Sequence, residues 1–360
     1  MTRTKIIRIA LFSLMLVLFI GCASEELSSA KMYISDKDWD NAEIYLVKAL
    51  AIEPENPEIL YLLGDLIYGQ NENWDKMNEM FNKALSINPE KSITVENKIG
   101  KVGDFIAMAK ERYWVKVYNQ GIGYFQEFQT SKEGKDSAVL QDAIKSFKTA
   151  IEIIPTGGQA YGSLSRCLLL GDDLDGAIEA VTTGVAKDQN NFYLNMTAGE
   201  MFAVADDKES ALIYYRKAVE IDSTNLTATQ QLAQTYYDLG EKELSLETYE
   251  TAISHIIDNI QKADFYYNLG VLNMQLGDFQ QAEDNFSLAY DYNPDDIDAL
   301  RGIAQTFENA EKWSRAEYFY LKLIDMEPEN PQHYRAMARV LLRQGDTDRA
   351  QEYFDKSKEM

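Results

Sequence analysis

The sequence predicts an all-α solenoid of about nine helix-turn-helix repeats, and three observations support this prediction. Small, aromatic and proline residues recur at a period of about 34 residues. Most of the prolines stand at one place in that period, where a proline ends a helix; they are Pro54, Pro89, Pro155, Pro294 and Pro328. No segment alternates apolar and polar residues as a half-buried strand does. A chain of 360 residues without a dividing linker fits a solenoid, because each repeat packs only on its neighbours.

The first 21 residues have the pattern of a secretory signal peptide. Arg3, Lys5 and Arg8 precede an apolar run from Ile9 to Ile20, which is shorter than the roughly 20 residues that span a bilayer. The run ends in Leu-Phe-Ile-Gly-Cys22, which resembles a bacterial lipobox and implies lipidation of Cys22. More than one acyl chain gives stable membrane attachment. An uncleaved membrane anchor is the alternative interpretation of the same residues.

By resemblance to sorted bacterial lipoproteins, the residue after the cysteine implies the destination. Ala23 stands where an aspartate retains such proteins in the inner membrane. The resemblance therefore implies an outer-membrane lipoprotein that faces the periplasm.

The repeat is clearest between Tyr266 and Pro294. Gly270 and Ala282 are small enough to let two helices cross closely, and Phe286 can fill the space between units. With Leu269 and Ala289, these residues resemble the pattern of the tetratricopeptide repeat (TPR) family. This resemblance implies a right-handed solenoid whose first helices form a concave groove for peptides or proteins.

The same small and aromatic positions recur along the chain. The small position of the first helix is Ala30, Gly64, Gly121, Ser165, Gly199, Ala233, Gly270, Ala304 and Ala338. The aromatic position of the second helix is Phe81, Phe147, Tyr215, Tyr249, Phe286, Tyr320 and Phe354. In a solenoid domain of residues 22–360, these positions place repeats near 23–56, 57–91, 114–157, 158–191, 192–225, 226–262, 263–296, 297–330 and 331–360.

Residues 92–113 fit no repeat. Apolar residues from Val95 through Ile99, Val102 and Ile106 to Tyr113 recur at intervals of three and four, as on one face of a helix. We therefore expect this extra helical segment to fuse with the third repeat into one helix from about residue 94 to about residue 129. The third repeat also carries a polar insertion at 130–137, which is either a docking feature or a tolerated surface excursion.

The resemblance implies which residues face the groove, and many of them are tyrosines. Tyrosine offers rigid apolar area with a polar tip, which suits peptide binding, although TPR helices are rich in aromatic residues in any case. The predicted groove tyrosines are Tyr61, Tyr68, Tyr118, Tyr193, Tyr237 and Tyr267.

Four arginines stand out in the last repeats. Arg335, Arg339 and Arg343 recur at i, i+4 and i+8, on one face of a helix, and Arg301 falls on the same side of the preceding repeat. Guanidinium groups arranged in this way can bind a carboxylate or an acidic peptide. Pairing with Glu308 or Asp298 within the chain, or a solvated stripe, is the alternative. The lysine, asparagine and arginine set with which some TPR proteins bind a terminal carboxylate is not reproduced.

Nothing in the sequence indicates catalysis, a metal or a cofactor. His255 and His333 lie three repeats apart, and Cys167 is the one thiol besides Cys22, so it is predicted to be a core residue. The acidic run 172–176 lacks the closing glutamate of a calcium loop. The formal charge of −23 opposes contact with phosphate backbones, so nucleic-acid binding is not expected.

These observations predict a non-catalytic protein-interaction scaffold tethered to the bacterial outer membrane. It resembles TPR lipoproteins that help to assemble envelope complexes, which implies protein or peptide partners and membrane attachment through lipid. Two other hypotheses stay open: a glycan-binding accessory lipoprotein, and a structural homo-oligomer. The oligomeric state itself is not indicated by the sequence.

Overall fold

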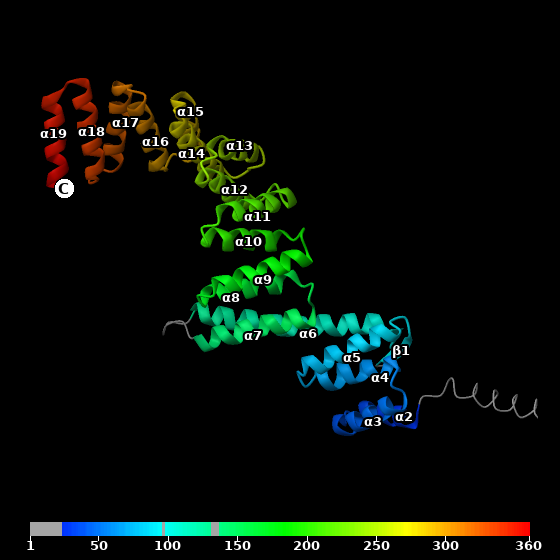
Figure 1. Ribbon diagram of the computed structural model, residues 1–360. Coiled ribbons are helices and arrows are strands. Elements are labelled where there is room, and N and C mark those ends of the chain that lie inside the picture. Colours follow the sequence, from blue (N-terminus) through cyan, green and yellow to red (C-terminus); the bar gives the residue numbers. More distant parts are fainter. Residues whose placement is uncertain (1–23, 96–97, 131–136) are drawn as a thin grey trace, which may run out of the picture. The chain divides into compact units, whose positions relative to one another are not determined.

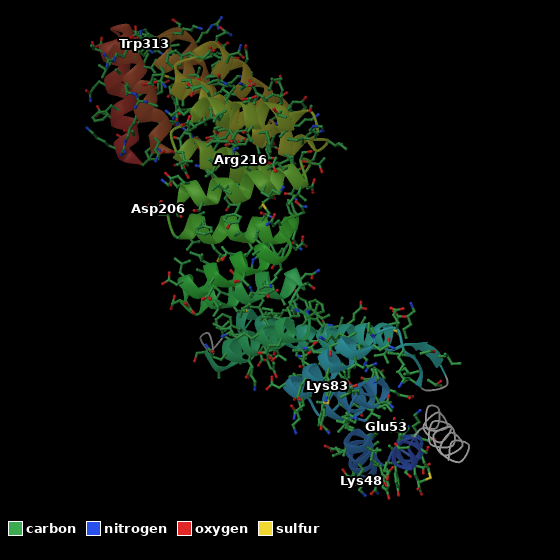
Figure 2. The ribbon with its side chains drawn as sticks, turned by 45° about the vertical axis from the view of Figure 1, so that its right-hand side comes forward. Lys48, Glu53, Lys83, Asp206, Arg216 and Trp313 are labelled. Carbon is green, nitrogen blue, oxygen red and sulfur yellow. The ribbon has the colours of Figure 1, made fainter. Side chains whose placement is uncertain are left out.

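The computed structural model describes residues 24–95, 98–130 and 137–360, and nearly all of them are helical (Figure 1). The chain divides into two compact units, Met1–Asp172 and Asp173–Met360. Lys48, Lys83 and Arg216, labelled in Figure 2, are exposed charged residues on the helices. Cys22, the remainder of the predicted signal peptide and most of the polar insertion at 130–137 lie outside the described residues.

The first unit is built from helix pairs interrupted by one hairpin. Its elements are α2 (Glu25–Ser35), α3 (Trp39–Ile52), α4 (Pro57–Leu62), the π-helical turn η1 (Leu63–Gly69), α5 (Trp74–Ile87), β1 (Ser92–Val95), β2 (Lys98–Lys101), α6 (Val102–Thr130), α7 (Ser137–Ile153) and α8 (Gly158–Leu170). Apolar side chains from α2 through α8 form one continuous core.

The second unit continues with eleven helices and is helical throughout its regular structure. These are α9 (Leu174–Lys187), α10 (Phe192–Val204), α11 (Lys208–Ile221), α12 (Leu226–Asp238), α13 (Lys242–Ile253), α14 (Asn259–Leu276), α15 (Phe279–Tyr292), α16 (Ile297–Asn309), α17 (Trp313–Met326), α18 (Pro331–Gln344) and α19 (Thr347–Glu359). Within this unit, each helix packs against the next one in the sequence. The all-α solenoid prediction is confirmed.

Short polar residues set the start of most helices. An aspartate precedes the second helix of most pairs, and its carboxylate accepts a hydrogen bond from the backbone N–H three residues later; examples are Asp38, Asp173, Asp207, Asp278 and Asp346. Asparagine caps first helices in a similar way: Asn191 and Asn225 accept from the N–H three residues later, and Asn56 and Asn330 from the N–H two residues later. At Asn56 and Asn330 a proline follows at the first helical position, where its missing N–H leaves no bond unmade.

The aromatic position of the repeat packs against the small position, as predicted. Phe286 of α15 lies between Gly270 of α14 and Gly302 of α16, and a Cβ at either glycine would come within 2.7 Å of the ring. A Cβ at Gly199 would likewise lie 2.5 Å from Tyr215. Each such ring therefore joins the two helices of its own repeat, and Phe286 also joins its repeat to the next one.

The long helix of the third repeat begins later than predicted. Residues 92–95 and 98–101 form two antiparallel strands in which Ser92 pairs with Lys101 and Val95 with Lys98, and α6 starts only at Val102. The run Ile93-Thr94-Val95 is β-branched, which favours a strand. Beyond Val102 the predicted stripe is buried along the helix, but Ile99 is 79% exposed on the hairpin. The expectation of a helix from about residue 94 was therefore wrong for residues 94, 95 and 98–101.

Two glycines on α6 test whether a small residue is needed where an aromatic ring lies against the helix. A Cβ at Gly121 would lie 2.8 Å from the Phe147 ring, whereas a Cβ at Gly123 would meet no atom within 4 Å. Replacing an exposed helical glycine with alanine stabilises by about 0.5–1 kcal/mol, and overpacking a core costs about 1–3 kcal/mol. In urea unfolding, Gly123→Ala is therefore expected to raise the midpoint and Gly121→Ala to lower it. Equal shifts in the two variants would contradict the packing account.

Candidate functional site

The four arginines of the predicted binding surface lie on α16 and α18 of the second unit. Arg335, Arg339 and Arg343 occupy successive turns of α18, and all three are exposed. Arg301 lies on α16 and its side chain is 34% exposed. The four predicted arginines therefore lie on the first helices of two neighbouring repeats.

Arg339 is held by a carboxylate of the preceding repeat. Its Nη2 donates to Oε2 of Glu308 at 2.9 Å, and its Nε donates to the other carboxylate oxygen. Tyr320 of α17 also donates to Oε2 of Glu308, at 2.7 Å. Burial by itself raises the pKa of the Glu308 carboxyl, but the hydrogen bonds from Arg339 and Tyr320 outweigh burial and hold that pKa below its ordinary value. Glu308 is thus a charged link between α16, α17 and α18.

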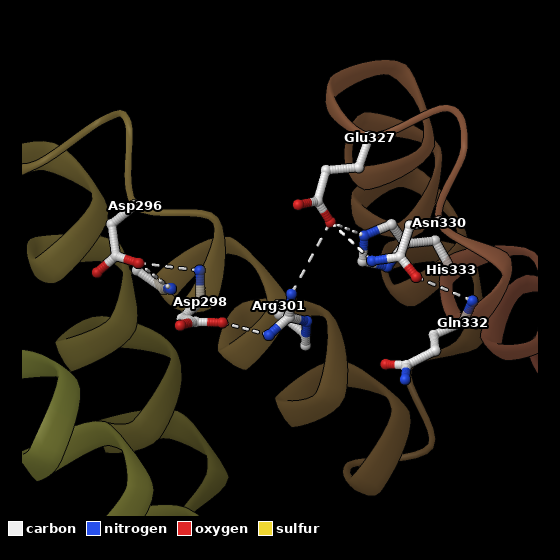
Figure 3. A network of polar contacts seen from close by, with 8 residues as sticks. Asp296, Asp298, Arg301, Glu327, Asn330, Gln332 and His333 are labelled. Atoms are coloured by element: carbon white, nitrogen blue, oxygen red, sulfur yellow. Dashed lines mark hydrogen bonds and ion pairs between the residues drawn. The ribbon is translucent and has the colours of Figure 1, made fainter.

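Arg301 also faces carboxylates of its own unit (Figure 3). It forms ion pairs with Asp298, one turn earlier on α16, and with Glu327 at 4.0 Å. Glu327 in turn lies 2.6 Å from Nε2 of the buried His333 and accepts from Asn330 at 2.9 Å. The hydrogen bonds from His333 and Asn330 lower the pKa of Glu327. Arg301 is therefore part of a polar network that joins α16 to the start of α18.

Arg335 and Arg343, the first and last arginines of α18, differ from Arg301 and Arg339 in their ion pairing. Among the described residues, neither Arg335 nor Arg343 has a carboxylate within 4.0 Å, although Arg343 contributes to the low pKa of Glu308 through its charge. Arg301 and Arg339 therefore pair with carboxylates of the chain itself, which was the alternative to ligand binding. Arg335 and Arg343 are the members of the set that stay open to a ligand.

The six predicted groove tyrosines are buried or half-buried rather than exposed. Tyr118 stacks on Trp114 with ring centroids 4.7 Å apart, and Tyr267 meets Phe286 edge-on at 5.5 Å. Tyr237 accepts a hydrogen bond from Gln275 at 2.9 Å. Tyr68, whose ring lies 5.1 Å from the Lys76 ammonium, and Tyr193 are both half-buried. These rings serve mainly to pack helices together.

Tyr61 was predicted as a groove residue, but its side chain is only 3% exposed. Its hydroxyl donates to Oδ2 of Asp65, one turn along the chain, at 2.7 Å. The expectation of an open tyrosine surface was therefore wrong at this residue, because Asp65 and the nearby α6 helix cover its ring. Its ring centroid lies 5.7 Å from that of Phe105 of α6.

The first unit contains a cavity of about 560 Å³ that sequence reasoning missed. Its walls come from α4, η1, α6 and the β1–β2 hairpin. The polar residues that line it include Asp65, Lys98, Arg112, Tyr113 and Lys116. The cavity therefore lies between the first helix of the second repeat, the hairpin, and the long helix α6, whose first turns precede the third repeat.

Asp65 is a buried carboxylate at the base of this cavity. Its side chain is 4% exposed, and it accepts from the Tyr61 hydroxyl and from Nη2 of Arg112. The Tyr113 hydroxyl lies 3.0 Å from Oδ1 and 2.7 Å from the carbonyl oxygen of Asp65. Burial, and then the Asp65 charge, raise the pKa of Tyr113 to about 12, so this hydroxyl remains a donor at neutral pH.

Backbone shape helps to bring these groups together. Asp65 belongs to the π-helical turn η1, and a Cβ on Gly69 of the same turn would lie 2.6 Å from the Tyr113 ring. A glycine is needed there because the ring approaches the backbone closely. One signal in the sequence was available: Asp65 is a single charge within the apolar run 59–69.

Cys167 and the acidic run 172–176, the other candidates for reactive or metal-binding groups, are a core residue and a helix cap. Cys167 is fully buried, and burial raises the pKa of its thiol to about 12, so it is a poor nucleophile. Asp173 of the acidic run accepts from the N–H of Gly176 at 2.9 Å and starts α9. Within the described part of the chain, no three histidine, cysteine, aspartate or glutamate side chains come together in a way that could hold a metal ion.

None of the helices in residues 24–95, 98–130 and 137–360 combines the length and apolar character that a membrane span requires.

Comparison with known proteins matches the repeats. Family models described as tetratricopeptide repeat match residues 57–91, 231–297 and 273–340. A TPR repeat-containing protein of Methanocaldococcus jannaschii is 23% identical over 222 residues, which are 51% of this chain and 39% of that protein. Tetratricopeptide repeat protein 8 of Caenorhabditis elegans is 22% identical over 214 residues, 49% of this chain and 41% of that protein. The chain thus spans less than half the length of these curated relatives.

A solved structure supports the fold in the same way. The C-terminal part of a TPR repeat-containing protein from Cytophaga hutchinsonii superposes with a TM-score of 0.54 at 16% sequence identity. The match covers 66% of this chain and 93% of that one. At this identity the likeness concerns the fold alone.

The Glu308 network predicts a pH dependence of stability. Because its folded pKa is lowered, Glu308 stabilises the fold above the ordinary glutamate pKa of about 4.3, and this contribution is lost as the pH falls through the folded pKa. Glu308→Gln is expected to lower the thermal midpoint at pH 7, with the difference from the wild type shrinking below about pH 4. Glu359→Gln, which removes an exposed carboxylate of α19, is the control. A difference in thermal midpoint between Glu308→Gln and the wild type that does not change with pH would contradict this role.

Proposed function

The chain is a tetratricopeptide repeat protein, and we propose that it is a non-catalytic scaffold that binds protein partners while acyl chains on Cys22 hold it at the bacterial outer membrane. TPR proteins in general mediate protein–protein interaction, and this general role supports the proposal. The observation that carries it is the pair of open arginines, Arg335 and Arg343, on the exposed side of α18. In a chain with a formal charge of −23, an exposed row of cations is a distinct feature.

The geometry of α18 favours an acidic partner segment. Glu308 neutralises the middle arginine, Arg339, and fixes its guanidinium, whereas the arginines one turn before and after it are open. Eight helical residues span about 12 Å. An extended segment rises about 3.3 Å per residue, so two carboxylates about four residues apart could reach Arg335 and Arg343 together. We therefore propose an extended partner segment with acidic residues at this spacing.

The position of Cys22 suggests how the scaffold is oriented. The first helix, α2, begins at Glu25, three residues after the proposed lipid site. Three residues span at most about 11 Å, so the first repeat of the mature protein would start close to the membrane surface. We propose that the chain works on the periplasmic side of the outer membrane in the assembly of an envelope complex. Lipid attachment there would leave the arginines of α18, near the other end of the chain, to bind a partner.

Glycan binding is less well supported than protein binding. Sugar-binding platforms need open aromatic rings, and the six predicted groove tyrosines are all buried or half-buried.

A homo-oligomer is tested together with the partner in the experiment below, because self-association would appear as capture of a second copy of this chain.

Charge reversal at the open arginines tests the binding proposal. Arg335→Glu/Arg343→Glu is compared with Arg315→Glu/Arg349→Glu, which carries the same charge change on α17 and α19. After circular dichroism shows equal helicity, tagged proteins are purified with their partners from envelopes in mild detergent. We expect the partner to be lost only from the α18 variant, because long-range repulsion affects both variants alike. Retention of the partner by the α18 variant, or equal loss from the two, would count against the proposal.

Metabolic labelling with palmitate tests the lipid anchor. The wild-type chain is expected to incorporate label and to sediment with outer membranes, since dual acylation holds a protein on a bilayer. Cys22→Ala is expected to take up no label and to keep its first 21 residues, because the acylated thiol is the processing signal. Label in Cys22→Ala, or an unlabelled wild-type chain in the soluble fraction, would exclude lipidation at this residue.

A further inference from the structure

The cavity of the first unit carries a local charge opposite to that of the chain. Lys98, Arg112 and Lys116 line it together with one carboxylate, that of Asp65, so cations outnumber carboxylates on its walls by two. Glu72 pairs with Lys116 at 2.7 Å and is itself half-exposed. In a protein with 58 acidic and 35 basic residues, this concentration of cations around a cavity marks a place suited to an anion.

Asp65 orients a cation rather than competing for the ligand. Its two oxygens are already occupied by the Tyr61 hydroxyl and by Tyr113 and Arg112, and only 4% of its side chain is exposed. The Arg112 guanidinium is held through Nη2, lies 4.8 Å above the Tyr113 ring, and remains 59% exposed. A guanidinium fixed on one side and open on the other is preorganised to bind a planar carboxylate.

The hairpin brings a second cation to the cavity. Successive residues of a strand point to opposite faces. Ile93, which is 4% exposed, and its partner Gly100, where a Cβ would lie 3.0 Å from the Phe105 ring, mark the inner face. Lys98 lies on that face and Ile99 on the other. Lys116 follows Arg112 by one turn of α6 and completes the set. The cationic walls thus come from the hairpin and from α6: Lys98 and Arg112 lie outside the repeats, and Lys116 lies at the start of the third repeat.

We infer that this cavity binds a carboxylate carried by a short segment of a partner protein. Arg112 and Lys98 supply charge-assisted hydrogen bonds to the carboxylate, and Phe105, Met108 and Leu66 supply an apolar wall for the neighbouring side chain. A volume of about 560 Å³ is within the range of pockets that hold small ligands. The site goes beyond the proposed function, because it lies in the first unit and uses none of the arginines of α18.

Titration calorimetry on the full chain tests this inference with four probes. They are N-acetyl-Gly-Phe-Glu-Gly-amide, with a side-chain carboxylate; N-acetyl-Gly-Phe-Gln-Gly, with a terminal carboxylate; N-acetyl-Gly-Phe-Gln-Gly-amide, which is neutral; and inorganic phosphate. We expect at least one carboxylate peptide to bind about tenfold more tightly than the neutral peptide, and comparison of the two identifies the source of the carboxylate. Raising the salt from about 50 to about 500 mM should weaken that binding.

Two lysines of one strand provide matched variants. Lys98→Glu reverses a charge on the cavity face of the hairpin, and Lys101→Glu reverses one on the opposite face; both side chains are exposed, so the fold should persist. Lys98→Glu is expected to weaken carboxylate binding about tenfold, and Lys101→Glu by less than about twofold. Equal affinity for the neutral and carboxylate peptides, equal effects of the two substitutions, or binding of phosphate alone would overturn the inference. None of these outcomes bears on the arginines of α18.

Discussion

The contact between a small residue on one helix and an aromatic ring on the next is the constraint on which the rest of the structure depends. Phe286 lies against Gly270 within its own repeat and against Gly302 of the following one, at distances that leave no room for a Cβ. A larger residue at either glycine would push the helices apart. Similar contacts occur at Gly64, Gly121 and Gly199. Where they occur, they set the distance between helices and so decide which side chains of successive first helices can reach one another.

Both units use a carboxylate to hold an arginine in place. In the second unit Glu308 holds Arg339, and in the first unit Asp65 holds Arg112; a tyrosine hydroxyl also donates to each carboxylate. An arginine on a free helix surface has many rotamers, and ordering it opposes binding. A carboxylate that fixes the guanidinium lowers that cost but also reduces its net charge. The open neighbours, Arg335 and Arg343 in one unit and Lys98 in the other, then provide the surplus positive charge for an acidic ligand.

Local signals predicted the helices well, and non-local contacts account for what could not be predicted. Asparagine and aspartate mark helix starts through bonds to residues two or three positions away, and proline marks helix boundaries through its own ring and missing N–H, so these signals can be read from the sequence. Val95 and Ile99 fit a helical period by coincidence, but β-branching at residues 93–95 favours the hairpin. Tyr61 is buried by a helix more than forty residues later, and Arg339 pairs with a glutamate 31 residues earlier. Glu308 and Asp298 could be named from the sequence as possible partners of the arginines, but the sequence does not show which arginine each carboxylate binds or that Arg335 and Arg343 are left without one among the described residues.

Photo-crosslinking in living cells tests the central claim, recognition of protein partners by first-helix surfaces, most directly. A benzophenone amino acid would replace Leu342, which is 58% exposed on α18 beside Arg343, and for comparison Tyr318, which is 55% exposed on the second helix α17. Partner binding at α18 predicts a discrete protein adduct from position 342 and none of the same mass from position 318. Adducts from position 318 alone, or no protein adduct from position 342 under conditions in which the chain is folded and at the envelope, would contradict it.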